Sequence, residues 1–338
     1  MANLFIIGNG FDIAHELPTS YEDFRKYLIL SYAPGYHKQM RMPQPLDRNI
    51  YPDGAEFVNK KDLITFILEL YDIMCENKNT WGDLEEQTGN IPYEEWLNKS
   101  DLRADDENGG IKESWTRDNF EIMAKNIRFA IPLVAGLIEE WISTINVTKA
   151  HSDQFQQLVN VDKDLFLSFN YTLTLEKIYQ ISPNNICHIH GKCHQGYSRP
   201  ISSIYIFDHD VQRCNSAIKF GHNKQYDIDE EHDFAYYGIR EIIEDTVNAL
   251  NKQVSQNITQ NKWFFDRLKD SDIRHVYSYG FSYSETDENY IKEIIKCIDN
   301  PNITWHFDDY DNDKNLEYQK KIRQYGYTGR FALQSFTI

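Results

Sequence analysis

The sequence predicts an α/β fold, in which a Rossmann-like parallel sheet has helices on both faces and a large helical insertion follows the first βα unit. The chain opens with a short apolar strand, Leu4–Ile7, a glycine turn and a helix start. Residues 21–160 show mostly helical patterns, and beyond them buried strands alternate with helices, as is typical of a parallel sheet. The first strand must join that sheet, because one short strand is not stable alone. We therefore expect an α/β domain over residues 1–20 and 161–338, interrupted by a mostly helical insertion over residues 21–160.

The insertion contains several helix signals and one long loop. Ser20, with Asp23 three residues later, has the pattern of a capping box and predicts a helix start. The prolines and glycines between Ala33 and Gly54 predict a loop. We expect further helices over residues 56–77 and 120–147, the second broken at Pro132, and an exposed acidic connection over residues 101–110.

The α/β domain contains the remaining strand signals, each a short run rich in branched and aromatic residues. Helical patterns over residues 290–298 and 316–325 separate the last of them. The strands that we expect are residues 164–169, 185–190, 203–207, 217–220, 273–279, 303–307 and 331–336.

The composition argues against several classes of protein. The chain has 52 acidic and 35 basic side chains, and its net charge of −17 argues against a protein that holds long nucleic acid. Its start lacks a signal-peptide pattern, and its longest apolar stretch, Phe129–Ile138, is too short to span a bilayer. The five scattered cysteines include no C-x-x-C pair and are typical of reduced thiols. We expect a cytoplasmic protein with no membrane partner, and a homo-oligomer is left open.

We expect no appreciable binding of duplex DNA at physiological salt. A net charge of −17 supplies no basic surface that would release counterions from a phosphate backbone. A titration of labelled duplex DNA at low and physiological salt measures this. Micromolar or tighter binding that weakens with salt would contradict the expectation and would point to a nuclease-like effector.

Glycines and compact polar side chains follow five of the expected strands. Ligands of parallel sheets bind outside the carboxyl ends of the strands, so these residues should meet at one edge. The glycines of the first turn let a ligand approach the backbone, and the helix beyond it presents N–H groups to an anion. That turn alone is a weak signal, because it lacks the third glycine of the dinucleotide fingerprint. The residues after the strands are Gly8, Asn9, Gly10 and Asp12; Asn170, Tyr171 and Thr172; His190 and Gly191; Gly221, His222 and Asn223; and Gly280, Ser282, Ser284 and Asp287.

Six blocks of the sequence together resemble the phage abortive-infection AbiH family, and they extend over nearly the whole chain. The same blocks are more distantly similar to the sirtuin-like NAD-consuming domains of bacterial defence systems. The resemblance implies an antiphage effector with a small nucleotide ligand and a phage-derived protein as its trigger. The blocks are Gly8–Asp12, Trp81–Glu85, Ser168–Glu176, His188–Gly191, Phe220–His222 and Tyr279–Asp287.

The sirtuin-like pattern implies a role for individual residues. Asn170 matches its catalytic asparagine and His190 its catalytic histidine, which implies cleavage of NAD as substrate, with His190 as general base. Asp12 stands where the pattern has serine, and Thr172 where it has aspartate. An acidic Asp12 would repel a pyrophosphate unless it faces a ribose hydroxyl. The ligand-binding residues that we expect are Gly8, Asn9, Gly10, Phe11, Asp12, Tyr171, Gly191, His222, Gly280, Ser282 and Asp287.

Two other functions stay open. The segment Cys187–His194 is dense in metal-ligating side chains, and Asp208 and Asp210 follow, so a metal-dependent hydrolase is conceivable. No established ligand spacing is matched, and we expect no metal. The other alternative is a nucleotide-binding sensor without catalysis, in which the helical insertion contacts a partner.

Overall fold

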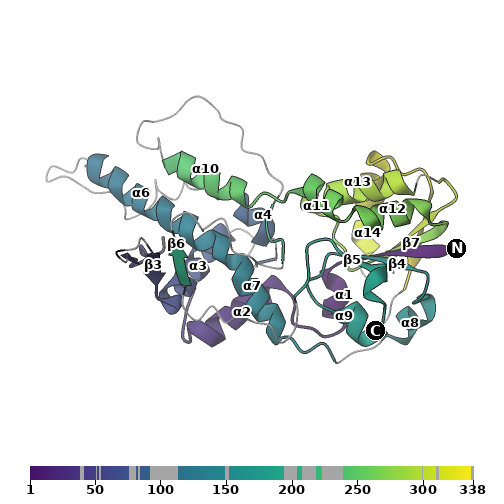
Figure 1. Cartoon of the computed structure of the whole chain (residues 1–338), viewed down its shortest axis with the longest axis horizontal. Coiled ribbons are helices and arrows are strands. Elements are labelled where there is room, and N and C mark those ends of the chain that lie inside the picture. Colours follow the sequence, from purple (N-terminus) through teal and green to yellow (C-terminus); the bar gives the residue numbers. More distant parts are fainter. Residues whose placement is uncertain are drawn as a thin grey trace.

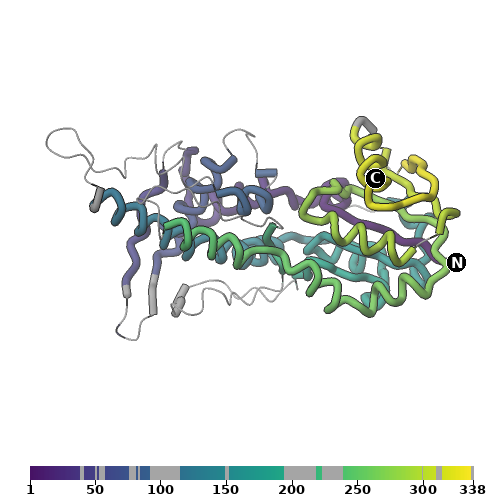
Figure 2. The backbone as a smooth tube through the Cα atoms, turned by 90° about the horizontal axis from the view of Figure 1, so that it is seen from above, coloured from purple at the N-terminus to yellow at the C-terminus, as the bar shows by residue number. Residues whose placement is uncertain are grey.

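The molecule has two lobes, one built around a parallel sheet and one mostly helical (Figures 1 and 2). We call them the sheet lobe and the helical lobe. The computed structural model describes residues 1–38, 42–50, 52, 55–75, 81–82, 84–91, 113–148, 152–193, 204–207, 218–222, 239–298, 300–309 and 312–335. None of the helices in these ranges is long and apolar enough to cross a membrane.

A six-stranded sheet of order β5-β4-β1-β7-β8-β9 forms the centre of the sheet lobe. All of its strand pairs are parallel. Counted along the chain, its strands follow the order 3-2-1-4-5-6 of the Rossmann fold, and the order reverses between β1 and β7. The predicted fold class is therefore confirmed. The strands are β1 (Ala2–Ile7), β4 (Leu165–Ser168), β5 (Ile186–His188), β7 (Ile273–Tyr279), β8 (Thr304–Asp308) and β9 (Arg330–Gln334).

Alternate residues of β1 point into two separate cores, one on each face of the sheet. Leu4 and Ile6 belong to the core that also holds side chains of α12, α13 and α14. Phe5 and Ile7 belong to the other, with side chains of α1, α8 and α9. Helices thus cover both faces. Their bounds are Lys262–Asp270 for α12, Glu288–Cys297 for α13, Asn312–Gln324 for α14, Asn9–Ala14 for α1, Asp153–Leu158 for α8 and Thr174–Tyr179 for α9.

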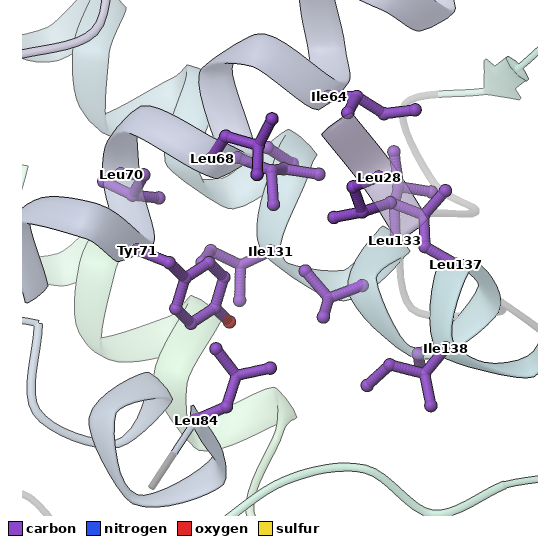
Figure 3. Packing of buried hydrophobic residues seen from close by; sticks show 14 of the residues in the cluster. Leu28, Ile64, Leu68, Leu70, Tyr71, Leu84, Ile131, Leu133, Leu137 and Ile138 are labelled. Carbon is purple, nitrogen blue, oxygen red and sulfur yellow. The ribbon is translucent and has the colours of Figure 1, made fainter. Parts of the chain in front are cut away.

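The helical lobe has its own apolar core, part of which is drawn in Figure 3. Ser20 forms the predicted capping box with Asp23 at the start of α2. The predicted break at Pro132 is also confirmed, since α6 ends at Ala130 and a short 3₁₀ turn, η2 (Ile131–Leu133), precedes α7. The helices are α2 (Tyr21–Tyr32), α3 (Lys60–Met74), α4 (Leu84–Thr88), α6 (Glu113–Ala130), α7 (Val134–Thr144) and α10 (Ile239–Ala249), which packs along α6.

The core of the helical lobe draws on both halves of the chain. Ile239, Ile243 and Val247 of α10 belong to the same core as Leu28 and Ile64. Helix α10 therefore returns to the helical lobe after the chain has formed half of the parallel sheet. The domain boundaries near residues 20 and 160 stay a prediction.

Three expectations about strands are wrong. The helix expected from residue 56 begins at Lys60, and β3 (Ala55–Val58) precedes it. The expected strand at residues 203–207 is present as β6 (Ile204–Phe207), but it pairs antiparallel with β3 in a separate three-stranded sheet with β2 (Asn49–Ile50). Residues 218–220 make an isolated bridge from Ile218 to Gly191 and no strand. The acidic connection expected at residues 101–110 lies outside the described residues.

Candidate functional site

A cleft of about 670 Å³ lies at the carboxyl ends of β1 and β7, where the strand order reverses. Open α/β sheets bind their ligands at this place. The loops after β1, β4, β5 and β7 line it, together with residues of α2, α4 and α7 from the helical lobe. The expected site residues that line it are Gly8, Asn9, Gly10, Asp12, Asn170, Tyr171, His190, His222, Gly280, Ser282 and Asp287.

Two expected site residues lie outside the lining of this cleft. The ring of Phe11 is fully buried and packs against Phe155 and Tyr279, with ring centroids 5.0 and 5.1 Å apart. Phe11 therefore belongs to the core between α1 and the sheet, where it cannot stack on a ligand. Gly191 has a φ of 82° and turns the chain after His190.

The glycines of the first turn make room for protein backbone, although both also line the cleft. A Cβ at Gly8 would lie 2.4 Å from the carbonyl oxygen of Gly280, and one at Gly10 would lie 2.6 Å from the Cα of Gly280. The N–H groups of Gly8, Gly10 and Phe11 donate to the carbonyls of Tyr279, Gly280 and Gly8, at 3.0, 2.9 and 3.0 Å. These three groups bind within the protein, so the turn does not present them to a phosphate as expected.

Asp12 is also bound within the protein. Its carboxylate accepts hydrogen bonds from the hydroxyls of Thr172 and Thr174, at 2.6 and 2.7 Å, and its residue is 1% exposed. Burial raises the pKa of Asp12 to about 6, against the opposing effect of these hydrogen bonds. Asp12 thus ties α1 to the loop after β4.

Replacing Asp12 by Asn should make stability less dependent on pH. The pKa of Asp12 rises from 3.8 in the unfolded chain to about 6 in the folded protein. Its contribution to stability is therefore complete below pH 3.8 and is lost as the pH rises through about 6. Asparagine stays neutral, so the variant should gain up to about 3 kcal/mol relative to the wild type as the pH rises from about 4 to 7. Thermal unfolding of both proteins across this range measures the difference. A difference that is the same at every pH would contradict the assignment.

His190 and Asp287 form a close pair at the centre of the cleft. Nε2 of His190 lies 3.2 Å from Oδ1 of Asp287, and the two side chains are 5% and 12% exposed. The His190 ring packs edge-on against Phe169 and Tyr290. Strand β5 ends at His188, so His190 lies in the following turn and not on the strand as expected. Asp287 ends a 3₁₀ turn, η6 (Glu285–Asp287), directly before α13.

Three buried polar atoms at this centre have no hydrogen-bond partner among the described residues: Oδ1 of Asn170, Nε2 of His190 and Oδ1 of Asp287. The contact from His190 to Asp287 is short enough for an ion pair but is not aligned as a hydrogen bond. The amide nitrogen of Asn170 donates to the carbonyl of Gly8 at 3.1 Å, which fixes its side chain. Buried polar atoms without partners are rare, and all three residues line the cleft, so these residues are candidates for contact with a polar ligand.

A family model described as "Bacteriophage abortive infection AbiH" matches residues 4–309. The chain belongs to the AbiH family. The match extends from β1 to β8 and so includes the cleft and the helical lobe. Membership supports a role in antiphage abortive infection. No curated protein and no solved structure matches the chain.

Glu85 ends the block Trp81–Glu85 and lines the AbiH cleft, but the sequence assigns it no role. Glu85 of α4 accepts hydrogen bonds from the hydroxyls of Tyr21 and Tyr171, at 2.9 and 3.0 Å. Its other oxygen accepts from Nζ of Lys252 at 2.6 Å. That ammonium lies 3.9 Å from Oδ1 of Asp287. No sequence pattern connects Glu85 with a lysine that lies 167 positions later.

The histidines of the AbiH block at residues 188–191 contact different carboxylates. Nε2 of His188 lies 3.0 Å from Glu176, and its Nδ1 lies 3.1 Å from the carbonyl of Asn170, whereas His190 contacts Asp287. Within the described ranges, no group of three or more His, Cys, Asp or Glu residues is placed to hold a metal ion. The metal hypothesis also uses His194, Asp208 and Asp210, which lie outside the described residues.

Proposed function

We propose that this AbiH protein is an antiphage effector whose cleft cleaves the nicotinamide–ribose bond of NAD, with His190 as general base. Family membership supports the antiphage role. The observation that carries the chemistry is the group of unpartnered polar atoms on Asn170, His190 and Asp287, at the point where the strand order reverses. A ribose offers hydroxyl groups, which both donate and accept hydrogen bonds, and so is complementary to this group.

The chemistry requires few protein groups. His190 takes a proton from water as the water oxygen bonds to the ribose carbon, and the bond to nicotinamide breaks. The bonding electrons go to the cationic ring, which leaves as neutral nicotinamide without an acid. Asp287, 3.2 Å from Nε2 of His190, orients the ring and stabilises the imidazolium that forms, so that Nδ1 is the nitrogen that takes the proton. Asn170 holds the ribose or the water without adding a charge.

The charge of the cleft is complementary to the transition state of this reaction. Cleavage of the glycosidic bond passes through an oxocarbenium ion, so positive charge develops on the ribose. Asp287 and Glu85 both line the cleft, and a fixed carboxylate in a buried site stabilises such a charge without rearranging. The same carboxylates would repel a phosphate.

Two departures from the sirtuin-like pattern compensate each other. Asp12 stands where that pattern has serine, and Thr172 where it has aspartate. The hydroxyl of Thr172 donates to the carboxylate of Asp12 at 2.6 Å. The hydroxyl and the carboxylate of the pattern are thus both present and in contact, but each comes from the other loop. This supports the sirtuin-like interpretation of the two loops.

The glycine turn narrows the proposal to one end of the substrate. Because the N–H groups of Gly8, Gly10 and Phe11 bind within the protein, we propose that the cleft recognises the nicotinamide riboside end of NAD and not the pyrophosphate. Nicotinamide riboside, which has no phosphate, should therefore also be a substrate.

The test is to incubate the purified protein with NAD, nicotinamide riboside or ATP and to measure free nicotinamide and phosphate by chromatography. Protein from infected and from uninfected cells is compared, so that a trigger is included. Free nicotinamide from the first two substrates supports the proposal. Nucleotide that stays bound and intact under both conditions overturns it in favour of a sensor, and phosphate release that requires a metal favours a metal-dependent hydrolase.

A further inference from the structure

Lys252 is a charged side chain buried where the helical lobe meets the sheet lobe. It follows α10 and precedes α11 (Val254–Gln260), and its side chain is 1% exposed. Its backbone is fixed as well, since its N–H donates to the carbonyl of His222 at 2.6 Å. A buried ammonium is unfavourable unless it is paired. Burial lowers the pKa of Lys252, but the carboxylates of Glu85 and Asp287 outweigh it and hold the pKa above its ordinary value, so Lys252 is charged.

The two carboxylates that hold Lys252 belong to different lobes. Glu85 lies on α4 of the helical lobe, 2.6 Å from the ammonium. Asp287 lies in the loop after β7 of the sheet lobe, 3.9 Å from it. Asp287 in turn lies 3.2 Å from His190, so an unbroken line of charged side chains joins α4 to the proposed base.

We propose that Lys252 and Glu85 are positioning residues for the His190–Asp287 pair, so that the helical lobe supplies part of the active site. This inference rests on the proposed function of the cleft. Lys252 holds Asp287 in place and balances its charge, while Glu85 holds Lys252. Neither residue needs to touch the reacting atoms.

Glu85 is itself held from both lobes. The hydroxyl of Tyr21 comes from α2 of the helical lobe, and that of Tyr171 from the loop after β4 of the sheet lobe. Burial, together with the charge of Glu85, raises the pKa of both tyrosines well above its ordinary value, so both remain neutral donors. Because Glu85 is fixed in this way, it holds the ammonium group of Lys252 between the two carboxylates and prevents it from pairing with Asp287 alone.

Lys252 also determines the charge of Asp287. Burial alone would raise the pKa of Asp287, but the charges of Lys252 and His190 and the hydrogen bond from Ser284 hold it below its ordinary value. Without Lys252, the pKa of Asp287 would rise, and its carboxyl group would be protonated at a higher pH. The neutral carboxyl group would no longer stabilise the imidazolium of His190. The titratable groups that face Asp287 are Lys252, His190, Tyr21, Tyr171 and Tyr290, with Glu85 beyond Lys252.

The first test measures nicotinamide release against pH for Lys252→Met, Lys252→Arg and Glu85→Gln. Lys252→Met should lower the rate by about 10²-fold, the effect of a misplaced catalytic group, and move the acidic limb of the profile to higher pH. Lys252→Arg should restore the limb. Glu85→Gln should move the acidic limb to lower pH. Lys252 then has Asp287 as its only carboxylate partner of the two, and its charge lowers the pKa of Asp287 further. The control is Lys60→Met, which breaks a partly buried pair with Glu140, 3.0 Å apart, outside the cleft lining. It should lower stability without moving the acidic limb.

The second test needs no substrate. Hydrogen exchange at the amide of Asp287, which donates to the carbonyl of Ser284 at 3.1 Å, reports how firmly this loop is held. Exchange should be faster in Lys252→Met and Glu85→Gln and unchanged in Lys60→Met. If exchange responds in this way but the wild type releases no nicotinamide, the proposed function fails and the coupling stands. If exchange is unchanged in Glu85→Gln, the nearly isosteric variant, and the acidic limb does not move, the positioning role is overturned.

Discussion

Replacing His190 by Ala should lower the rate of nicotinamide release by roughly 10²–10⁴-fold, the effect expected for one general base. The change removes the imidazole that lies 3.2 Å from Asp287 and leaves the backbone of the turn in place. Asn170→Ala should cause a similar loss, because it removes the oxygen that has no partner among the described residues. Steady-state release of nicotinamide from NAD, with thermal unfolding measured in parallel, separates this loss from unfolding.

His275→Ala is the matched control. His275 lies near the start of β7, and its Nδ1 is 2.9 Å from Nε2 of His306. It belongs to the same sheet as the cleft but lies away from the carboxyl ends of the strands. The control should therefore keep its activity. Equal losses in His275→Ala and His190→Ala would show that histidine substitutions act through stability, and the general-base role would be withdrawn.

Protection against phage gives a second readout of the same variants. If NAD cleavage arrests infected cells, His190→Ala and Asn170→Ala should abolish protection at normal protein levels. If both variants protect as well as the wild type, the cleft is not catalytic and the sensor function is favoured. If substitutions of His188, His194 and Asp208 abolish activity together with a bound metal, the metal-dependent hydrolase is favoured.

The fold class could be predicted because the strands of the parallel sheet are buried on both faces. Such strands are nearly continuous apolar runs, and Leu4–Ile7 and Leu165–Leu167 are visible as such in the sequence. The small antiparallel sheet could not be predicted in the same way. Strand β3, with the sequence Ala-Glu-Phe-Val, shows no strict alternation of apolar and polar residues. It also lies just before the strong helical pattern of α3. The sequence does predict the strand at β6, but the residues of this strand do not specify which partner it pairs with.

The centre of the cleft could be predicted because topology brings strand ends together. Asn170, His190 and Ser282 follow different parallel strands, and a parallel sheet places all such ends at one edge. His222 also lines the cleft, although the strand expected before it is absent from residues 218–222. Its position depends on the loop that contacts Asn251.

The charged network around Lys252 could not be predicted, because it exists only where the two lobes meet. Glu85 lies in an acidic segment of the sequence and Lys252 in a polar one, and residues in such segments are usually exposed. Their burial depends on how the helical lobe packs against the sheet lobe, which no local pattern records. The close packing of the first glycines could not be predicted either, for a related reason. Their close neighbour is Gly280, from the opposite half of the chain.

Replacing Gly280 by Ala should destabilise the protein by about 3 kcal/mol or more, because strain and overpacking add. Gly280 has a φ of 60°, and a Cβ there would lie 2.2 Å from the nitrogen of Phe11 and 2.4 Å from the carbonyl carbon of Gly10. These are backbone atoms of the turn after β1, which is held to Gly280 by a hydrogen bond of 2.9 Å from the N–H of Gly10. No side chain can move aside, so the two loops at the floor of the cleft must separate. Thermal or denaturant unfolding measures the loss.

Gly326→Ala separates the two contributions to that loss. Gly326 also has a positive φ, of 102°, but a Cβ there would meet nothing within 4 Å among the described residues. Its substitution therefore carries backbone strain without a clash and should destabilise the protein by about 1–2 kcal/mol. Equal losses at the two positions would show that the loops after β1 and β7 move apart at little cost. In that case the N–H groups of Gly8 and Gly10 would be free to bind a phosphate, and the restriction to the nicotinamide riboside end of NAD would no longer hold.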